Sequence, residues 1–271
     1  MLSAYGSDAK ILAGGQSLVP ILNMRLASPR HIVDINHLHG ETADPEDDGD
    51  GLVFGPLVRQ EAVERSPRVA EKVPLLAEAI EHVAHAAIRN RGTVVGSVAH
   101  ADPAAELPAV LVALGGTVLA RRASGRREID ASDFFAGPLE NSMGDDEWAE
   151  GVRWPARRAG EGFAFAEFAR RSGDYALCGV AAAVRGSKGD RTLTLAYLGM
   201  GDVPGVLNVG GLDDDFASGT TVEDTVADLT KPLEAGGDIH ATPRYRRWLA
   251  QELGVRAARA AWADAGSGNQ R

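Results

Sequence analysis

A segment near the start of the chain carries residue types suited to binding a phosphate group. An apolar run at residues 10–13 leads directly into the glycine pair Gly14 and Gly15. A glycine pair after a buried strand lets the backbone approach a ligand closely, and lets successive N–H groups converge on an anion. Gln16 and Ser17 add side-chain donors. The same pattern is typical of an ordinary turn between a strand and a helix, so this segment alone does not identify a site.

A second segment further along the chain offers similar chemistry. It combines Thr93, Gly96 and Ser97, and two acids follow at Asp102 and Glu106. A carboxylate near a phosphate-binding loop can accept hydrogen bonds from ribose hydroxyls. An acid at the start of a helix can instead cap the helix or complement its dipole. We interpret Asp102 as a helix cap, and for Glu106 both roles stay open.

Neither segment matches the better-known nucleotide motifs. The chain has no G-x-G-x-x-G that opens a βαβ unit and no G-x-x-x-x-G-K-[ST], which argues against a Rossmann fold and a P-loop. Cys178 is the single cysteine, so the chain cannot form an internal disulfide or supply the usual ligands of an iron–sulfur cluster. Any redox centre must therefore be organic or be held by a partner chain.

The hydropathy pattern places both segments in an α+β arrangement. Strands are predicted at residues 10–13, 31–35, 51–55, 93–98, 117–121, 127–129 and 148–154. Helices are predicted at 75–88 and, opened by Asp102 and Pro103, at 104–114.

The composition shifts at residues 155–162, which are rich in Pro, Gly and Arg, and we place a domain boundary there. Beyond this boundary, an antiparallel sheet is predicted from strands at 164–170, 180–185 and 192–199. Two helices, at 222–229 and 244–263, are predicted to close the chain.

Charge and composition narrow the class of protein. The 271 residues include 38 acidic and 28 basic side chains, for a net charge of −10, and an acidic surface repels phosphate backbones, so no nucleic-acid partner is expected. No apolar run approaches the ~20 residues of a membrane span. The first residues form neither a basic leader nor an apolar signal segment, so we expect a cytoplasmic location. The pairs His82/His85 and His37/His39 lack further converging ligands, so no metal is expected.

Several segments, taken in order, are those of a known family. They are ILAGGQSLVP at 11–20, NMRLA at 23–27, VDI at 33–35, the run 88–108 that opens with IRNRGT, FFAGPL at 134–139, RSGDYA at 171–176, DIHA at 238–241 and YRR at 245–247. Over nearly its whole length the chain resembles the FAD-binding medium subunits of the carbon monoxide dehydrogenase and xanthine dehydrogenase group, the molybdenum hydroxylases. Two long motifs and the shorter ones in the family's order are far more specific than either glycine segment alone.

The resemblance implies an α+β fold in two domains. Residues 1–156 would form a two-lobed FAD-binding domain of the vanillyl-alcohol-oxidase/PCMH type, with the lobes divided near residue 50. Residues 162–265 would form a smaller α+β C-terminal domain, an antiparallel sheet plus helices. The implied cofactor-binding residues are Leu12, Ala13, Gly14, Gly15, Gln16, Ser17, Leu18, Thr93, Val94, Val95, Gly96, Ser97, His100 and Glu106.

The resemblance also implies noncovalent FAD and two partner chains. A small iron–sulfur subunit and a large molybdenum-cofactor subunit would join this chain in a dimer of heterotrimers. Electrons from the partner's clusters would pass through the flavin to quinone, dioxygen or NAD, and no residue here would act on the hydroxylated substrate. The single cysteine agrees with this division of labour.

Two departures from the family pattern leave other hypotheses open. The chain starts almost at the first glycine segment, where the family usually has a further strand and helix. Val95 stands where the family usually has glycine, and a valine adopts a positive φ only at a cost. A shortened, flavin-free relative that acts as a structural or assembly partner would fit both departures, and a free-standing flavin reductase is a third hypothesis.

Overall fold

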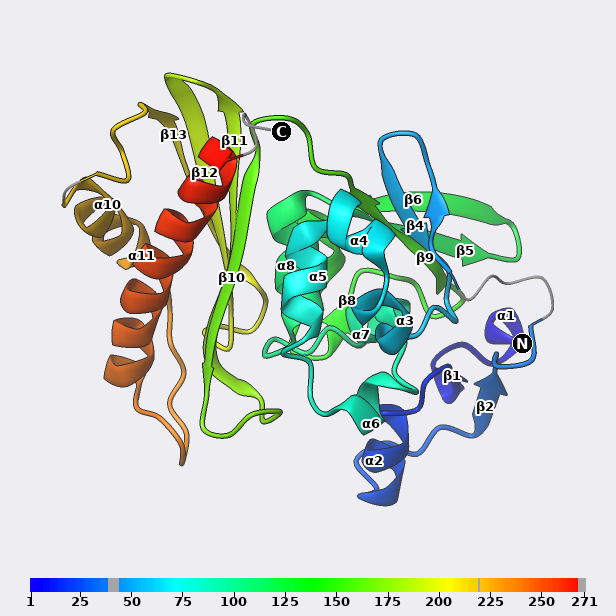
Figure 1. The fold of residues 1–271 in the computed structure, drawn as a ribbon. Helices are drawn as coiled ribbons and strands as arrows, with labels where there is room; N and C mark the ends of the chain where they lie inside the picture. The colour runs from blue at the N-terminus through cyan, green and yellow to red at the C-terminus, as the bar shows by residue number, and fades with distance from the viewer. Residues whose placement is uncertain (39–43, 219, 268–271) are drawn as a thin grey trace.

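The computed structural model describes residues 1–38, 44–218 and 220–267. Residues 1–38, the first lobe, are built around two parallel strands, with Ile11 paired to Val33. The elements of this lobe are α1 (Leu2–Tyr5), the 3₁₀ turn η1 (Gly6–Asp8), β1 (Ala9–Leu12), α2 (Leu18–Asn23) and β2 (His31–Asp34). Figure 1 shows this lobe in dark blue, beside the larger body of the molecule.

A five-stranded antiparallel sheet forms the frame of the second lobe. Its order is β3-β4-β9-β5-β6, so β9, the last of these strands in the chain, lies at the centre. The strands are β3 (Glu46–Asp47), β4 (Gly51–Phe54), β5 (Thr117–Arg122), β6 (Gly125–Asp130) and β9 (Trp148–Pro155). Between β6 and β9 lie α9 (Ala131–Phe134), β7 (Phe135–Gly137) and β8 (Glu140–Asn141).

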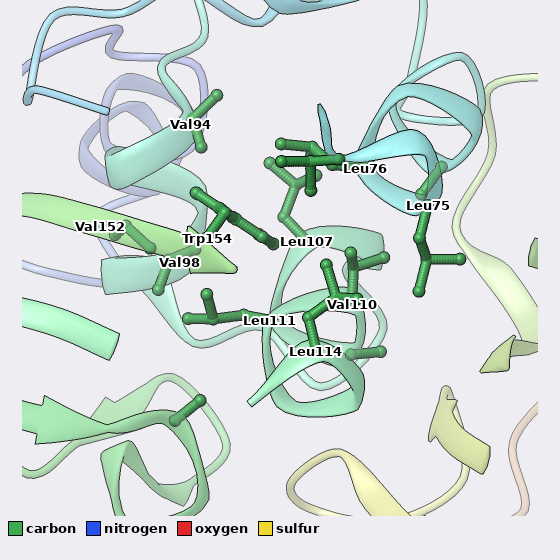
Figure 2. Packing of buried hydrophobic residues seen from close by; sticks show 14 of the residues in the cluster. Leu75, Leu76, Val94, Val98, Leu107, Val110, Leu111, Leu114, Val152 and Trp154 are labelled. Carbon is green, nitrogen blue, oxygen red and sulfur yellow. The ribbon is translucent and has the colours of Figure 1, made fainter. Parts of the chain in front are cut away.

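Helices cover one face of this sheet and enclose the main core. They are α3 (Gln60–Glu64), α4 (Pro67–Lys72), α5 (Pro74–Ile80), α7 (Val94–His100) and α8 (Glu106–Leu114), while α6 (Ala86–Arg89) lies beside α3. Figure 2 shows the centre of the core, where Leu107 and Leu111 of α8 meet Val98 of α7 and Trp154 of β9. Trp154 is fully buried. Apolar burial of this kind supplies most of the driving force for folding.

The C-terminal part forms a four-stranded antiparallel sheet, most of which is buried on both faces. Its strands, in order, are β10 (Gly162–Ala169), β11 (Ala176–Ser187), β12 (Asp190–Leu198) and β13 (Gly205–Leu212), followed by α10 (Thr221–Thr230) and α11 (Pro243–Ser267). Because side chains alternate along a strand, Phe163 and Phe165 join the core of the second lobe. Ala164 and Ala166 join a separate core with α11.

Figure 1 shows that this sheet lies between α11, on one face, and α5 and α8, on the other. Side chains of β11 point alternately into the two cores on either side of the sheet, so this strand is buried over most of its length. None of the helices in the described part of the chain combines the length and the hydropathy that a membrane-spanning segment requires.

The strand predicted at 93–98 is wrong, because helix α7 occupies this segment. Thr93 is its N-cap, and the threonine Oγ1 accepts a hydrogen bond from the Gly96 N–H at 3.0 Å. Valine favours strands, but Val94, Val95 and Val98 are all buried on this helix. Packing against the core therefore overrides intrinsic propensity.

Two helix predictions need correction. The helix predicted at 75–88 is two helices, because the chain turns between α5 and α6 and Ala84 has a φ of 45° in the left-handed region. The helix predicted from 104 begins at Glu106, with Ala105 as its N-cap. Asp102 does not cap it; its Oδ1 accepts a hydrogen bond from the Ala104 N–H at 2.9 Å in the preceding turn.

Candidate functional site

The first loop, residues 13–17, connects β1 to α2. Gly15 has a φ of 73°, in the left-handed region that favours glycine. In the part of the chain that the structure describes, the backbone N–H groups of residues 14–17 donate to no other backbone group. The Ser17 hydroxyl likewise makes no capping bond to α2. Consecutive unpaired N–H donors beside a free hydroxyl are a donor set that suits a phosphate.

The first loop lies directly against the start of the second segment. A Cβ atom added at Gly14 would lie 2.5 Å from the carbonyl oxygen of Arg91 and 2.9 Å from the Cα atom of Gly92. Only glycine permits backbones to approach this closely. The fold thus brings the two predicted loops together, although they are far apart in the sequence. The side-chain amide of Gln16 points back into its own loop and donates to the Gly14 carbonyl at 3.1 Å.

The second loop segment, residues 93–97, is the capped first turn of α7. A Cβ atom at Gly96 would lie 2.5 Å from the Thr93 Oγ1, so the glycine makes room for the helix cap. Val95 is helical and buried against the core, and it is not among the residues with positive φ. The backbone cost expected for this valine is therefore absent. The Ser97 side chain is only half-buried.

A polar cluster continues from the far end of α7. His100 is the last residue of this helix, and burial lowers the pKa of its ring. Glu106, the first residue of α8, is buried, and desolvation raises the pKa of its carboxyl to about 7. The neighbouring carboxylates Glu167 and Asp102 act in the same direction as desolvation on Glu106. Glu106 is thus poised to exchange a proton near neutral pH.

The C-terminal domain contributes to this cluster. The Nδ1 atom of His82 lies 3.3 Å from the Oε1 atom of Glu167 in β10, and this hydrogen bond raises the pKa of His82. Tyr175 is largely exposed to solvent. The pKa of its hydroxyl is raised, first by partial desolvation and then by the adjacent Asp102 carboxylate. Side chains from both domains therefore meet beside Glu106.

The predicted residues fall into two groups. Residues 12–18 lie against Arg91 and Gly92, which directly precede residues 93–97, whereas His100 and Glu106 lie at the junction with the C-terminal domain. Among the described residues, no side-chain hydrogen bond or ion pair joins the two groups.

Sequence reasoning missed His82, Glu167 and Tyr175 as members of the polar cluster. Tyr175 belongs to the motif RSGDYA, which could have drawn attention to it. The motif does not indicate which residues the tyrosine approaches. In the described residues no group of three or more potential ligands forms a metal site, and His39 lies outside them. Two open hollows on the described surface, one near Arg185 and Asn208 and one near Arg126 and Arg153, contain none of the predicted site residues.

Comparison with known protein families covers both parts of the chain. Residues 1–157 match the family described as the FAD binding domain in molybdopterin dehydrogenase. Residues 163–261 match the CO dehydrogenase flavoprotein C-terminal domain. Among curated proteins, the nicotine 6-hydroxylase medium subunit of Paenarthrobacter nicotinovorans is 41% identical over 257 residues, covering 93% of this chain and 89% of the relative. The carbon monoxide dehydrogenase medium chain of Hydrogenophaga pseudoflava is 32% identical, with 97% and 92% covered.

Solved structures with a similar fold belong to the same kind of enzyme as the matching sequences. Carbon monoxide dehydrogenase from Hydrogenophaga pseudoflava contains a chain that superposes with a TM-score of 0.87 at 32% identity, covering 97% of this chain and 92% of that one. Quinoline 2-oxidoreductase from Pseudomonas putida 86 matches with a TM-score of 0.86, at 32% identity and with 98% and 92% covered. These matches confirm the predicted two-domain α+β FAD-binding fold. The chain therefore belongs to the family of FAD-binding medium subunits of the molybdenum hydroxylases.

Proposed function

We propose that this chain holds FAD and serves as the electron-transfer subunit of a molybdenum hydroxylase, passing electrons from a partner's iron–sulfur clusters to an external acceptor. One observation carries the proposal: the N–H groups of residues 14–17, which donate to no described backbone group, lie in a loop whose Gly14 packs against Arg91 and Gly92, within a domain of an FAD-binding family. Bound FAD supplies the redox chemistry, and the protein supplies binding, orientation and electrostatics.

The residues present suit the parts of FAD. The N–H groups of the first loop would donate to the pyrophosphate, with residues 12–18 enclosing it. The second loop segment would add the hydroxyls of Thr93 and Ser97, with residues 93–97 on the other side. Glu106 would accept hydrogen bonds from sugar hydroxyls, and His100 would flank it. The division into an FAD-binding domain at 1–156, with lobes split near 50, and a C-terminal domain at 162–265 belongs to the same proposal.

The partner chains follow from what this chain lacks. Its single cysteine, Cys178, is fully buried, and burial raises the pKa of its thiol to about 12, so it is a poor ligand. This supports the proposal that the electrons arrive from clusters on another chain. We propose a small iron–sulfur subunit and a large molybdenum-cofactor subunit, assembled as a dimer of heterotrimers in the cytoplasm. The isolated chain would hydroxylate no substrate.

The proposal is tested by purifying the chain alone and coexpressed with the genes that flank it. We expect an absorbance spectrum with flavin bands and release of one noncovalent FAD per chain on denaturation. We also expect hydroxylase turnover only when a cluster-containing chain and a molybdenum-containing chain copurify. A chain that stays colourless after reconstitution with FAD would support the flavin-free alternative, and flavin reduction by NADH without partners would support a free-standing reductase.

A further inference from the structure

A ring of hydrogen bonds surrounds the contact between the two loops. Arg59 donates through Nη1 to the Arg91 carbonyl at 2.5 Å and through Nη2 to the Asn36 Oδ1 at 2.7 Å. The Asn36 Nδ2 in turn donates to the Ala13 carbonyl at 2.8 Å. Ala13 precedes Gly14, which lies against Arg91. The ring therefore closes across the boundary between the first lobe and the second.

Each side chain of the ring is held in one orientation. The backbone N–H of Asn36 donates to the Asp34 Oδ1 at 2.9 Å, and the Asn36 Nδ2 approaches the same oxygen at 2.7 Å. This leaves the Asn36 Oδ1 as the acceptor for Arg59. Arg59 directly precedes α3, and its backbone forms a β-bridge with Thr93. The guanidinium thus extends from the strand-like edge of the second loop segment to the first loop.

Apolar burial contributes little to holding the first lobe in place. Of its described hydrophobic residues, only Ala9 and Ile35 are buried, and α2 buries none. The side chains of Val19, Met24 and Leu26 are exposed. A lobe without a core of its own depends on specific bonds for its position. The bonds at Asn36 and Arg59 join it to the second lobe next to the unpaired N–H groups.

We propose that Arg59 and Asn36 are positioning residues that fix the first loop against α7 at the spacing required for the FAD pyrophosphate. The inference rests on the proposed function. Arginine suits this role because its rigid planar fork reaches two acceptors at once, whereas lysine presents a single point charge. Asparagine suits it because one amide both accepts from Arg59 and donates to the Ala13 carbonyl.

The test compares Arg59→Lys and Asn36→Asp with Arg65→Lys as the matched control. Arg65 ends the same helix and pairs at its surface with Glu61. Asn36→Asp retains an acceptor for Arg59 but removes the donor to Ala13. The FAD dissociation constant of the apo-subunit is measured by quenching of flavin fluorescence, and the Tm of the apo-subunit is measured separately.

We expect both ring variants to raise the FAD dissociation constant by about tenfold or more, whereas the control stays at the wild-type value. Their apo Tm should stay close to that of the control, because the ring lies outside both cores. Wild-type FAD affinity in both ring variants would overturn the inference while leaving the proposed function intact. A fall in Tm without a change in affinity, or failure of both variants to fold, would assign the ring to stability and also overturn it. A wild-type chain that binds no FAD would remove the proposed function itself.

Discussion

The two lobes of the FAD-binding domain support their loops in opposite ways. The first lobe exposes apolar side chains such as Met24 and Leu26, and it places the first loop beside a ring of polar contacts. The second lobe places Thr93 and its neighbours on α7, whose valines are buried in a continuous core. The first loop is therefore held by directional bonds and close backbone contact, whereas the second is held by apolar packing.

The difference matters because hydrogen bonds and packing respond differently to mutation. A single atom in the wrong place can displace a loop that rests on backbone contact, while the rest of the protein stays folded. A loop anchored in a core keeps its position until the core itself is disrupted. Flavin affinity and folding stability should accordingly separate between the two lobes.

The largest effect on binding is expected for Gly14→Ala. The new Cβ atom would overlap the carbonyl oxygen of Arg91, which is backbone and cannot rotate away. We expect the FAD dissociation constant to rise by about 100-fold or more, with little change in the apo Tm. Equilibrium titration of the apo-subunit measures this effect. Gly125→Ala is the control, because nothing lies within 4 Å of the added atom there.

The largest effect on stability is expected for Leu111→Ala in the second lobe. Leu111 is completely buried, and truncation of such a leucine costs about 2–5 kcal/mol. The same change at Leu26, which is 73% exposed in the first lobe, should alter the free energy of unfolding by about 0.5 kcal/mol or less. Urea denaturation of the apo-subunits compares the two. Similar losses at both positions would contradict the distinction between the lobes.

An intermediate effect concerns Glu106, at the end of the second lobe nearest the C-terminal domain. Because burial raises its pKa from 4.5 to about 7, the folded protein holds this proton more tightly than the unfolded chain does. The contribution of Glu106 to stability is therefore greatest below pH 4.5 and is lost as the pH rises through about 7, by on the order of 1–3 kcal/mol. The raised pKa of His82 acts in the same direction above its ordinary value of 6.5.

Glu106→Gln should flatten this dependence, and Glu71→Gln, at an exposed position, should not. The free energy of unfolding of the apo-subunit is measured across the same pH range for both variants. An unchanged slope in Glu106→Gln would show that Glu106 titrates normally in the folded protein.

Hydropathy patterns in the sequence predicted several helices and strands correctly. The strands β1, β2, β5 and β9 and the helix α11 are confirmed close to their predicted bounds. The strand β13 was missed, because its sequence GVLNVGGL contains three glycines, which strand patterns disfavour. The valine-rich α7 was assigned as a strand, because only the tertiary core shows that its valines pack at helical spacing.

The sequence predicted the contacts of the candidate site less completely than it predicted the fold. The local sequence singled out both glycine segments. A glycine is required at position 14 because of the contact with Arg91, and that contact cannot be predicted from a local sequence pattern. Gly96 also accommodates the Thr93 hydroxyl, a contact that the glycine pattern alone does not indicate. His82 and Glu167 come from different domains, so their pairing depends entirely on how the domains pack.

The smallest effect is expected at Thr93. Thr93→Val keeps the shape of the side chain but removes the hydroxyl that accepts from the Gly96 N–H, and loss of such a cap costs about 1 kcal/mol. Thr93→Ser keeps the hydroxyl and should behave like the wild type. Because Val94, Val95 and Val98 still anchor α7, we expect the valine variant to weaken FAD binding by less than about tenfold. Fluorescence titration and urea denaturation of both variants measure this. A loss of affinity as large as that of Gly14→Ala would mean that the second loop also depends on one polar contact, and the contrast between the lobes would then fail.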